Sequence, residues 1–275
     1  MKSLKLSAVA LGLAVTCGIE LSPAYGQDSD GYWEKIQQRG VLRCGAASAP
    51  PYIIRDPKTA SYSGIFVDLC RQFGDQLGVK VEIVDTTWDN MVAGLQAGRW
   101  DVSMALNRTP RRALAVNYSE PVWDFRISAL FDRLNPKFKV EPVSLKDIDK
   151  PENTVALVAG TAIDAAVTKK LRYAQVLRLP DIDSSRLALV SRRADILFED
   201  ADSNSIFEAT NAQKWKSVHP NPPIAKQGIA FAVRLEAQPA DLQALNIMIQ
   251  NEVASGQVAD LGKYYIEQLG TAMRR

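Results

Sequence analysis

The sequence has few of the residues that most catalytic and metal sites require. It contains 275 residues but a single histidine, His219, which lies among prolines in a predicted loop. One histidine in such a place supports neither a Ser-His-Asp or Cys-His catalytic set nor a histidine-based metal cluster. We therefore expect no catalytic residue, no metal and no cofactor, although carboxylates alone could still perform acid–base chemistry.

The sequence also lacks an excess of charge of either sign and a long apolar segment in its main part. The formal net charge is +2, and no run of basic residues is interleaved with aromatics. This charge balance argues against nucleic acid as a partner. No segment after the N-terminus is long and apolar enough to cross a bilayer. We expect a soluble monomer.

The N-terminal residues are typical of a targeting segment rather than of a fold. Lys2 and Lys5 precede an apolar run from Leu6 to Val15, and a small-residue cleavage site ends the segment at Gly26. This pattern predicts a signal peptide over residues 1–26, cleaved after Gly26, and a periplasmic mature protein. Cys17 leaves a lipoprotein as the alternative.

Two cysteines, Cys44 and Cys70, remain after the predicted cleavage. Export permits a disulfide between them, because Cys44 ends a predicted strand and Cys70 lies on the following predicted helix. Free cysteines are commonly buried as small apolar residues. We favour two unlinked, buried cysteines and keep the disulfide as the alternative.

The hydrophobic pattern alternates between strand and helix in two separate regions. Each region predicts a β-α-β-α-β unit, which implies a parallel sheet covered by helices. The first has strands at 41–44, 79–84 and 101–105 with helices at 65–77 and 88–97. The second has strands at 154–158, 176–179 and 194–198 with helices at 162–171 and 185–191.

Two further predicted strands, 126–131 and 228–233, lead from the first unit to the second and back, and residues 242–269 are largely helical. The fold class is therefore α/β, with two doubly wound lobes joined by two hinge strands. We predict lobe 1 over residues 27–126 plus 231–275 and lobe 2 over 127–230. Ligands of such sheets bind beyond the carboxyl ends of strands, which here means the cleft between the lobes.

One loop after a predicted strand has the features of an anion site. It contains Asn107, Thr109 and Arg112, and Thr109 can cap a helix that begins at Pro110. Free backbone N–H groups at such a point can receive an anion. Arg112 is a cation in a first helical turn, where the helix dipole disfavours it. We interpret Arg112 as a bidentate partner for a carboxylate, with a solvated arginine as the alternative.

Other candidate residues lie at corresponding points of the second unit or are aromatic. Thr161, followed by Ala162, can cap the next helix, with a plain helix start as the alternative. Asp200 follows a strand end and can accept hydrogen bonds from an ammonium group, although it could equally cap a turn. Trp88 and Tyr52 could stack over a ligand or pack in the core.

The ordered motifs of the chain resemble one known family. They include Gly40-Val41-Leu42-Arg43, Pro50-Pro51-Tyr52, Gly64 to Leu69, Leu95 to Gly98 with Asp101, Thr109 to Arg112, Ala159-Gly160-Thr161, Ala194-Asp195 and Gly228-Ile229-Ala230. Together they resemble the family 3, polar-amino-acid type, solute-binding proteins of ABC transporters. The resemblance implies a type II periplasmic binding protein, or Venus-flytrap, that delivers a small amino-acid-like ligand to a membrane permease.

The resemblance also implies roles for the candidate residues. Arg112 would bind the α-carboxylate of the ligand with help from Asn107, Thr109 and Thr161, Asp200 would bind the α-ammonium group, and an aromatic near Trp88 or Tyr52 would cover the side chain. The sequence departs from the family pattern at Ala49, Asn107 and Ala162, so the ligand side chain stays open.

Two other functions on the same scaffold stay open. One is an enzyme that resembles cyclohexadienyl dehydratase and acts on prephenate or arogenate. Such an enzyme needs an acid in the cleft, and Gln227 stands where we would expect a glutamate. The other is a sensor or accessory protein that reports the ligand to a membrane partner.

Overall fold

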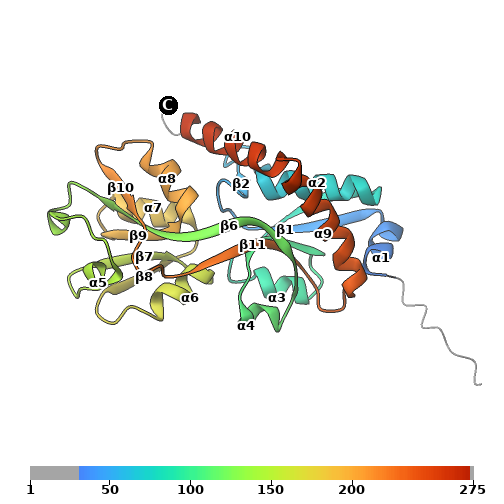
Figure 1. Ribbon diagram of the computed structural model, residues 1–275, viewed down its shortest axis with the longest axis horizontal. Coiled ribbons are helices and arrows are strands. Elements are labelled where there is room, and N and C mark those ends of the chain that lie inside the picture. Colours follow the sequence, from blue (N-terminus) through green and yellow to red (C-terminus); the bar gives the residue numbers. More distant parts are fainter. Residues whose placement is uncertain (1–30, 273–275) are drawn as a thin grey trace, which may run out of the picture. The chain divides into compact units, whose positions relative to one another are not determined.

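The computed structural model describes residues 31–272, which form a nine-stranded mixed sheet with helices on both sides and a separate two-stranded sheet (Figure 1). The predicted signal peptide and Cys17 lie outside the described residues. The strands follow the order β4-β1-β5-β11-β6-β9-β7-β8, and β10 pairs with β6. No helix within residues 31–272 has the length and apolar character needed to cross a bilayer.

Three parallel strands form the core of the first lobe: β4 (Lys80–Asp85), β1 (Val41–Ala46) and β5 (Val102–Asn107). They are covered by α1 (Tyr32–Arg39), α2 (Ile65–Leu77) and α3 (Met91–Gln96). α2 ends at Gly78, which adopts a left-handed conformation with φ of +72° that glycine tolerates at no steric cost. The predicted β-α-β-α-β unit is therefore confirmed, although the predicted helix at 88–97 begins only at Met91.

The second lobe repeats this arrangement with β8 (Gln175–Leu179), β7 (Thr154–Val158) and β9 (Ile196–Asp200), again parallel. Its helices are α5 (Leu145–Ile148), α6 (Ala162–Thr168), α7 (Ile182–Val190) and α8 (Ala201–Glu208). The short strand β10 (Trp215–Val218) pairs antiparallel with β6. The sequence pattern predicted none of α5, β10 and α8, and the first residues of α8 are small or polar.

Two long strands cross between the lobes, as predicted. β6 (Asn117–Asp132) and β11 (Lys226–Val233) pair antiparallel, with Ile229 opposite Trp123. β11 also pairs with β5, and the far end of β6 pairs with β9. Both strands thus belong to the sheet as it passes from one lobe to the other. The predicted lobe boundaries fall inside these strands and stay a prediction.

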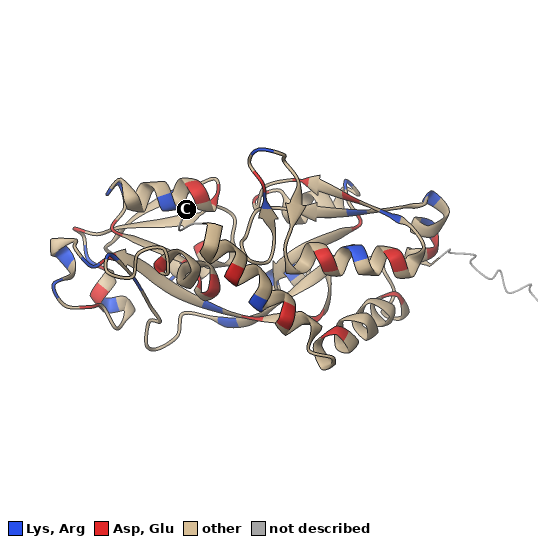
Figure 2. Cartoon of the chain, turned by 90° about the horizontal axis from the view of Figure 1, so that it is seen from above, with Lys and Arg blue, Asp and Glu red and all other residues tan. Residues whose placement is uncertain are grey.

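The remaining elements complete the surface of the first lobe and the connections. The predicted C-terminal helical segment is two helices, α9 (Pro239–Ala254) and α10 (Gln257–Ala272), separated at Gly256 where φ is +86°. Short elements are β2 (Ile54–Arg55), β3 (Tyr62–Ser63), α4 (Pro110–Ala113) and the 3-10 helix η1 (Pro136–Phe138). Basic and acidic positions are interspersed over the face seen in Figure 2.

Cys44 and Cys70 form a disulfide, so the favoured prediction of two unlinked cysteines was wrong. Cys44 lies on β1 and Cys70 on α2, and both side chains are almost fully buried. Since α2 packs directly on β1, the core that buries the two residues also brings their sulfur atoms together.

Candidate ligand-binding site

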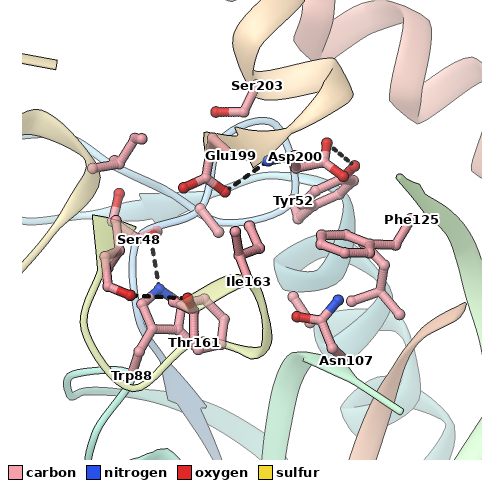
Figure 3. A pocket seen from close by; sticks show the side chains of 15 residues that line it. Ser48, Tyr52, Trp88, Asn107, Phe125, Thr161, Ile163, Glu199, Asp200 and Ser203 are labelled. Atoms are coloured by element: carbon pink, nitrogen blue, oxygen red, sulfur yellow. Dashed lines mark hydrogen bonds between the residues drawn. The ribbon is translucent and has the colours of Figure 1, made fainter. Parts of the chain in front are cut away.

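A cavity lies between the two lobes and is lined from both (Figure 3). Its walls are largely apolar, with a few polar side chains, as is usual for a small-molecule site. The first lobe and the crossing strands contribute Ser48, Ala49, Tyr52, Trp88, Ala105, Asn107, Phe125 and Ile229, and the second lobe contributes Val158, Thr161, Ile163, Ile182, Glu199, Asp200 and Ser203.

The structure brings five of the eight predicted site residues to this cavity, namely Tyr52, Trp88, Asn107, Thr161 and Asp200. The other three, Thr109, Arg112 and Ala162, line a larger and more open cleft beside it. Thr161 lines both, so the cavity and the cleft adjoin at the start of α6.

Asp200 is the last residue of β9 and also the N-cap of α8, because its Oδ1 accepts a hydrogen bond from the Asp202 N–H at 2.9 Å. Its side chain is buried and faces the cavity. Burial raises the pKa of Asp200 to about 7, and the nearby charge of Asp202 adds to this effect. The capping role that we considered as the alternative is thus present together with the position in the cavity.

Tyr52 reaches from the first lobe to the acids of the second. Its hydroxyl lies 2.7 Å from Asp200 Oδ1 and 2.9 Å from Asp202 Oδ2. A hydroxyl has one proton, so two full hydrogen bonds require a second proton on a carboxyl group. Trp123 Nε1 already donates to Asp202 Oδ2 at 2.8 Å. Because the pKa of Asp200 is raised to about 7, Asp200 is the acid that supplies this proton and completes the contact between the lobes.

Arg112 makes another connection from the first lobe to the second. Its Nη2 donates to the carbonyl oxygen of Gly160 at 3.0 Å, and Thr109 accepts the Arg112 N–H as the predicted helix cap. Its Nη1 is buried without a partner among residues 31–272, and burial lowers the pKa of Arg112. A buried charged donor without an acceptor in the chain is suited to an anionic ligand group.

Asn107 and Thr161 differ in whether their polar side-chain atoms already have hydrogen-bond partners. Asn107 Nδ2 is buried and also lacks a partner among the described residues. Thr161 caps α6, since its hydroxyl accepts the Asp164 N–H at 3.0 Å and donates to the Val158 carbonyl at 2.9 Å. Asn107 therefore has a free donor for a ligand, whereas Thr161 is already engaged.

The aromatic candidates are fixed by their own contacts. Trp88 is half-buried and its Nε1 donates to the Ser48 carbonyl at 3.2 Å, so one face of the cavity is held by two residues of the first lobe. Tyr52 is buried and packs edge-on against Phe66. Both residues can line a ligand side chain without moving the backbone.

Sequence reasoning missed Glu199, which lies next to Asp200 in the cavity wall. Its Oε1 accepts the Asp200 N–H at 3.0 Å, and burial raises its pKa while the charge of Arg186 acts in the opposite direction. The available signal was a charged residue at the end of the apolar strand Ile196–Phe198. Gln227 stands at the position where a dehydratase-like enzyme would need a glutamate, and it lines the open cleft rather than the cavity.

Residues 31–272 contain no group of three side chains that could bind a metal ion. His219 is exposed after β10 and lines a separate hollow near Arg126 and Asp202. The arrangement within the described residues can thus bind a small polar molecule through opposite charges, and it places an acid rather than a histidine at the centre.

A two-lobed α/β fold with a charged cavity between the lobes defines a ligand-capturing protein. The sequence model of bacterial extracellular solute-binding proteins, family 3, matches residues 42–268. The chain belongs to that family.

Its relatives include binding proteins and an enzyme. The chain is 24% identical over 216 residues to the cyclohexadienyl dehydratase of Pseudomonas aeruginosa, covering 76% of this chain and 77% of the enzyme. It is 24% identical to the L-cystine-binding protein TcyA of Bacillus subtilis, covering 72% and 81%. A crystal structure of an ancestral amino acid-binding protein, a precursor of cyclohexadienyl dehydratase, superposes with a TM-score of 0.76 at 28% identity and covers 85% and 99%.

Proposed function

We propose that the protein binds an amino acid or a similar small zwitterion between its lobes, without chemical conversion, and delivers it to the permease of an ABC transporter. The observation that carries this proposal is the arrangement of opposite charges: Arg112, with an unpaired buried donor, approaches the cleft from the first lobe, and Asp200 lines the cavity from the second. Named relatives that bind amino acids support the same conclusion.

In this proposal Arg112 and Asn107 bind the α-carboxylate of the ligand and Asp200 binds its α-ammonium group. Thr109 and Thr161 hold the two helix starts in place, Ala162 leaves room at the start of α6, and Trp88 and Tyr52 cover the ligand side chain. The single hydroxyl proton of Tyr52 can serve either Asp200 or Asp202 but not both. When Asp200 is ionised, the ammonium group of the ligand donates a hydrogen bond to it in place of the proton that Asp200 binds in the ligand-free protein.

Capture requires the lobes to open and close about β6 and β11, with lobe boundaries at residues 126/127 and 230/231. The contacts Arg112–Gly160 and Tyr52–Asp200 join the lobes in the arrangement described here. The proposal places the protein in the periplasm, with residues 1–26 removed as the signal peptide, and as a monomer.

The test is a panel of amino acids and related acids in thermal unfolding, followed by calorimetry on the best ligand. A ligand at 100 times its Kd stabilises the folded state by about 2.7 kcal/mol. Arg112→Ala should weaken that ligand by roughly 2–5 kcal/mol, because it leaves a buried carboxylate unpaired. The matched control is Arg108→Ala, an exposed arginine of the same loop. An Arg112→Ala variant that binds within threefold of the wild type contradicts the proposal.

Glu199 favours one second candidate, an enzyme of the cyclohexadienyl dehydratase type. A buried carboxyl group whose pKa is raised can act as a general acid on a bound hydroxyl group. The purified protein should then convert prephenate or arogenate, and Glu199→Gln should abolish the conversion. If no product formed even at protein concentrations close to that of the substrate, this second candidate would be refuted and the binding function would remain.

A further inference from the structure

The cavity contains two neighbouring acids, whereas one is enough for an α-ammonium group. Among the fifteen residues that line it, Glu199 and Asp200 are carboxylic acids and none is a lysine, arginine or histidine. Arg112 lies in the adjoining cleft. The charge inside the cavity is therefore negative when both acids are ionised, and this charge is not explained by the binding of an ordinary zwitterion.

The position of Glu199 is fixed by its neighbours. It pairs with Ser128 of β6 in the sheet, and its Oε1 accepts the Asp200 N–H at 3.0 Å. Within residues 31–272 the only hydrogen bond to the Glu199 carboxyl group is the one to Oε1, and Glu199 lines the cavity. Figure 3 shows the Glu199 carboxyl group in the cavity wall, between Ser48 and Asp200. One oxygen thus anchors the side chain and the other is free to bind.

The charge of Arg186 acts on Glu199, but the hydrogen bonds of Arg186 go to other groups. Arg186 is buried, its Nη2 donates to the Ser203 carbonyl and hydroxyl at 3.2 and 2.9 Å, and its guanidinium lies over the Phe207 ring. Its Nε has no hydrogen-bond partner among residues 31–272. Burial raises the pKa of Glu199 in spite of this charge, which means that the carboxylate is under-compensated by the chain itself.

We propose that Glu199 forms an acidic subsite beside Asp200 that binds a second positively charged group of the ligand. The inference rests on the proposed function, in which Asp200 binds the α-ammonium group. A ligand with a side-chain amine or guanidinium provides the second cation, and the apolar walls at Trp88, Ile163 and Ile182 accommodate its aliphatic carbons. Glu199 is thus a specificity-determining residue that selects diamino acids over neutral ones.

The test compares charged ligands with neutral ligands of similar shape on the same protein. Calorimetry is performed with lysine, ornithine and arginine, and with norleucine, glutamine and citrulline as the neutral counterparts. A charge-assisted hydrogen bond predicts that the wild type binds the best charged ligand roughly 10- to 100-fold more tightly than its counterpart. Wild-type protein that binds a neutral counterpart equally well or better overturns the inference and leaves the proposed function intact.

The matched variants are Glu199→Gln and Glu152→Gln. Glutamine keeps an oxygen that can accept the Asp200 N–H, so the fold is retained, and Glu152 is an exposed glutamate outside the cavity. Glu199→Gln should reduce the preference for the charged ligand to within threefold of its counterpart, whereas Glu152→Gln should leave the affinities for both ligands unchanged.

Three other results have separate meanings. A preference that survives in Glu199→Gln overturns the inference, because another group then selects the cation. Loss of all affinities in a folded Glu199→Gln protein also overturns it, because Glu199 would then serve the common head of the ligand. Wild-type protein that binds no α-amino acid refutes the proposed function, and the inference with it.

Discussion

Asp200 should make the ligand-free protein less stable as the pH rises. Its pKa is raised from 3.8 in an ordinary aspartate to about 7. A factor of ten in proton binding is 1.36 kcal/mol, so ionised Asp200 destabilises the fold by about 4 kcal/mol relative to protonated Asp200. The raised pKa contributes stability that is fully present below pH 3.8 and is lost as the pH rises to about 7. Asp200→Asn should remove this dependence, because asparagine is neutral and caps a helix equally well.

The assay is thermal unfolding of the ligand-free protein and the Asp200→Asn variant between pH 5 and pH 8. With about 2.1 cal/mol/K of unfolding entropy per residue, 4 kcal/mol corresponds to a melting temperature that is about 8 °C higher for the variant at pH 8. The difference should shrink toward pH 5, and the variant should lose its ligand. Equal differences at pH 5 and pH 8, or a variant that is less stable at pH 8, would refute the role of Asp200 as a buried, protonated acid.

Two further predictions concern the disulfide and the contact between the lobes. Reduction of Cys44–Cys70, which are 26 residues apart, should lower the free energy of unfolding by about 3.5 kcal/mol in the chain-entropy description, measured by denaturant titration with and without reductant; an unchanged midpoint contradicts this. Gly160→Ala should weaken ligand binding at least tenfold by calorimetry, because the added Cβ would lie 2.0 Å from Asp89 Oδ1 and 2.8 Å from Asp89 Cα across the lobes. Gly78→Ala is its matched control, since φ is +72° at both glycines and nothing lies within 4 Å of the added Cβ at Gly78. If the two variants bound the ligand with equal affinity, the close approach of Gly160 to Asp89 would not matter for binding.

The sequence predicted the fold where the hydrophobic pattern has a clear period. The two β-α-β-α-β units and the two crossing strands are confirmed, because buried parallel strands and amphipathic helices leave a local signal. The start of β6 was missed because Glu120 and Pro121 interrupt the alternation in residues 117–125. Helix α8 was missed because its first residues, Ala201 to Ser205, are small or polar and follow a cap that reads equally well as a turn.

The candidate site was predicted in part for a similar reason. Asp200, Tyr52 and Asn107, which line the cavity, were candidates because they follow strand ends or belong to motifs of the family. The contact between Tyr52 and Asp200 joins residues that are 148 positions apart, and no local pattern contains it. The position of Glu199 in the cavity depends on its Oε1 turning back to the Asp200 N–H, which sequence periodicity does not describe.

The strand order has a consequence for the order in which the two lobes fold. The second lobe is continuous in sequence between β6 and β11, whereas the first lobe also needs β11 and α9 from the end of the chain to complete its sheet and cover it. Synthesis of the chain from its N-terminus delivers those pieces last. The lobe that begins the sequence is therefore the one that finishes folding second, and until then the edge of β5 that later pairs with β11 is exposed.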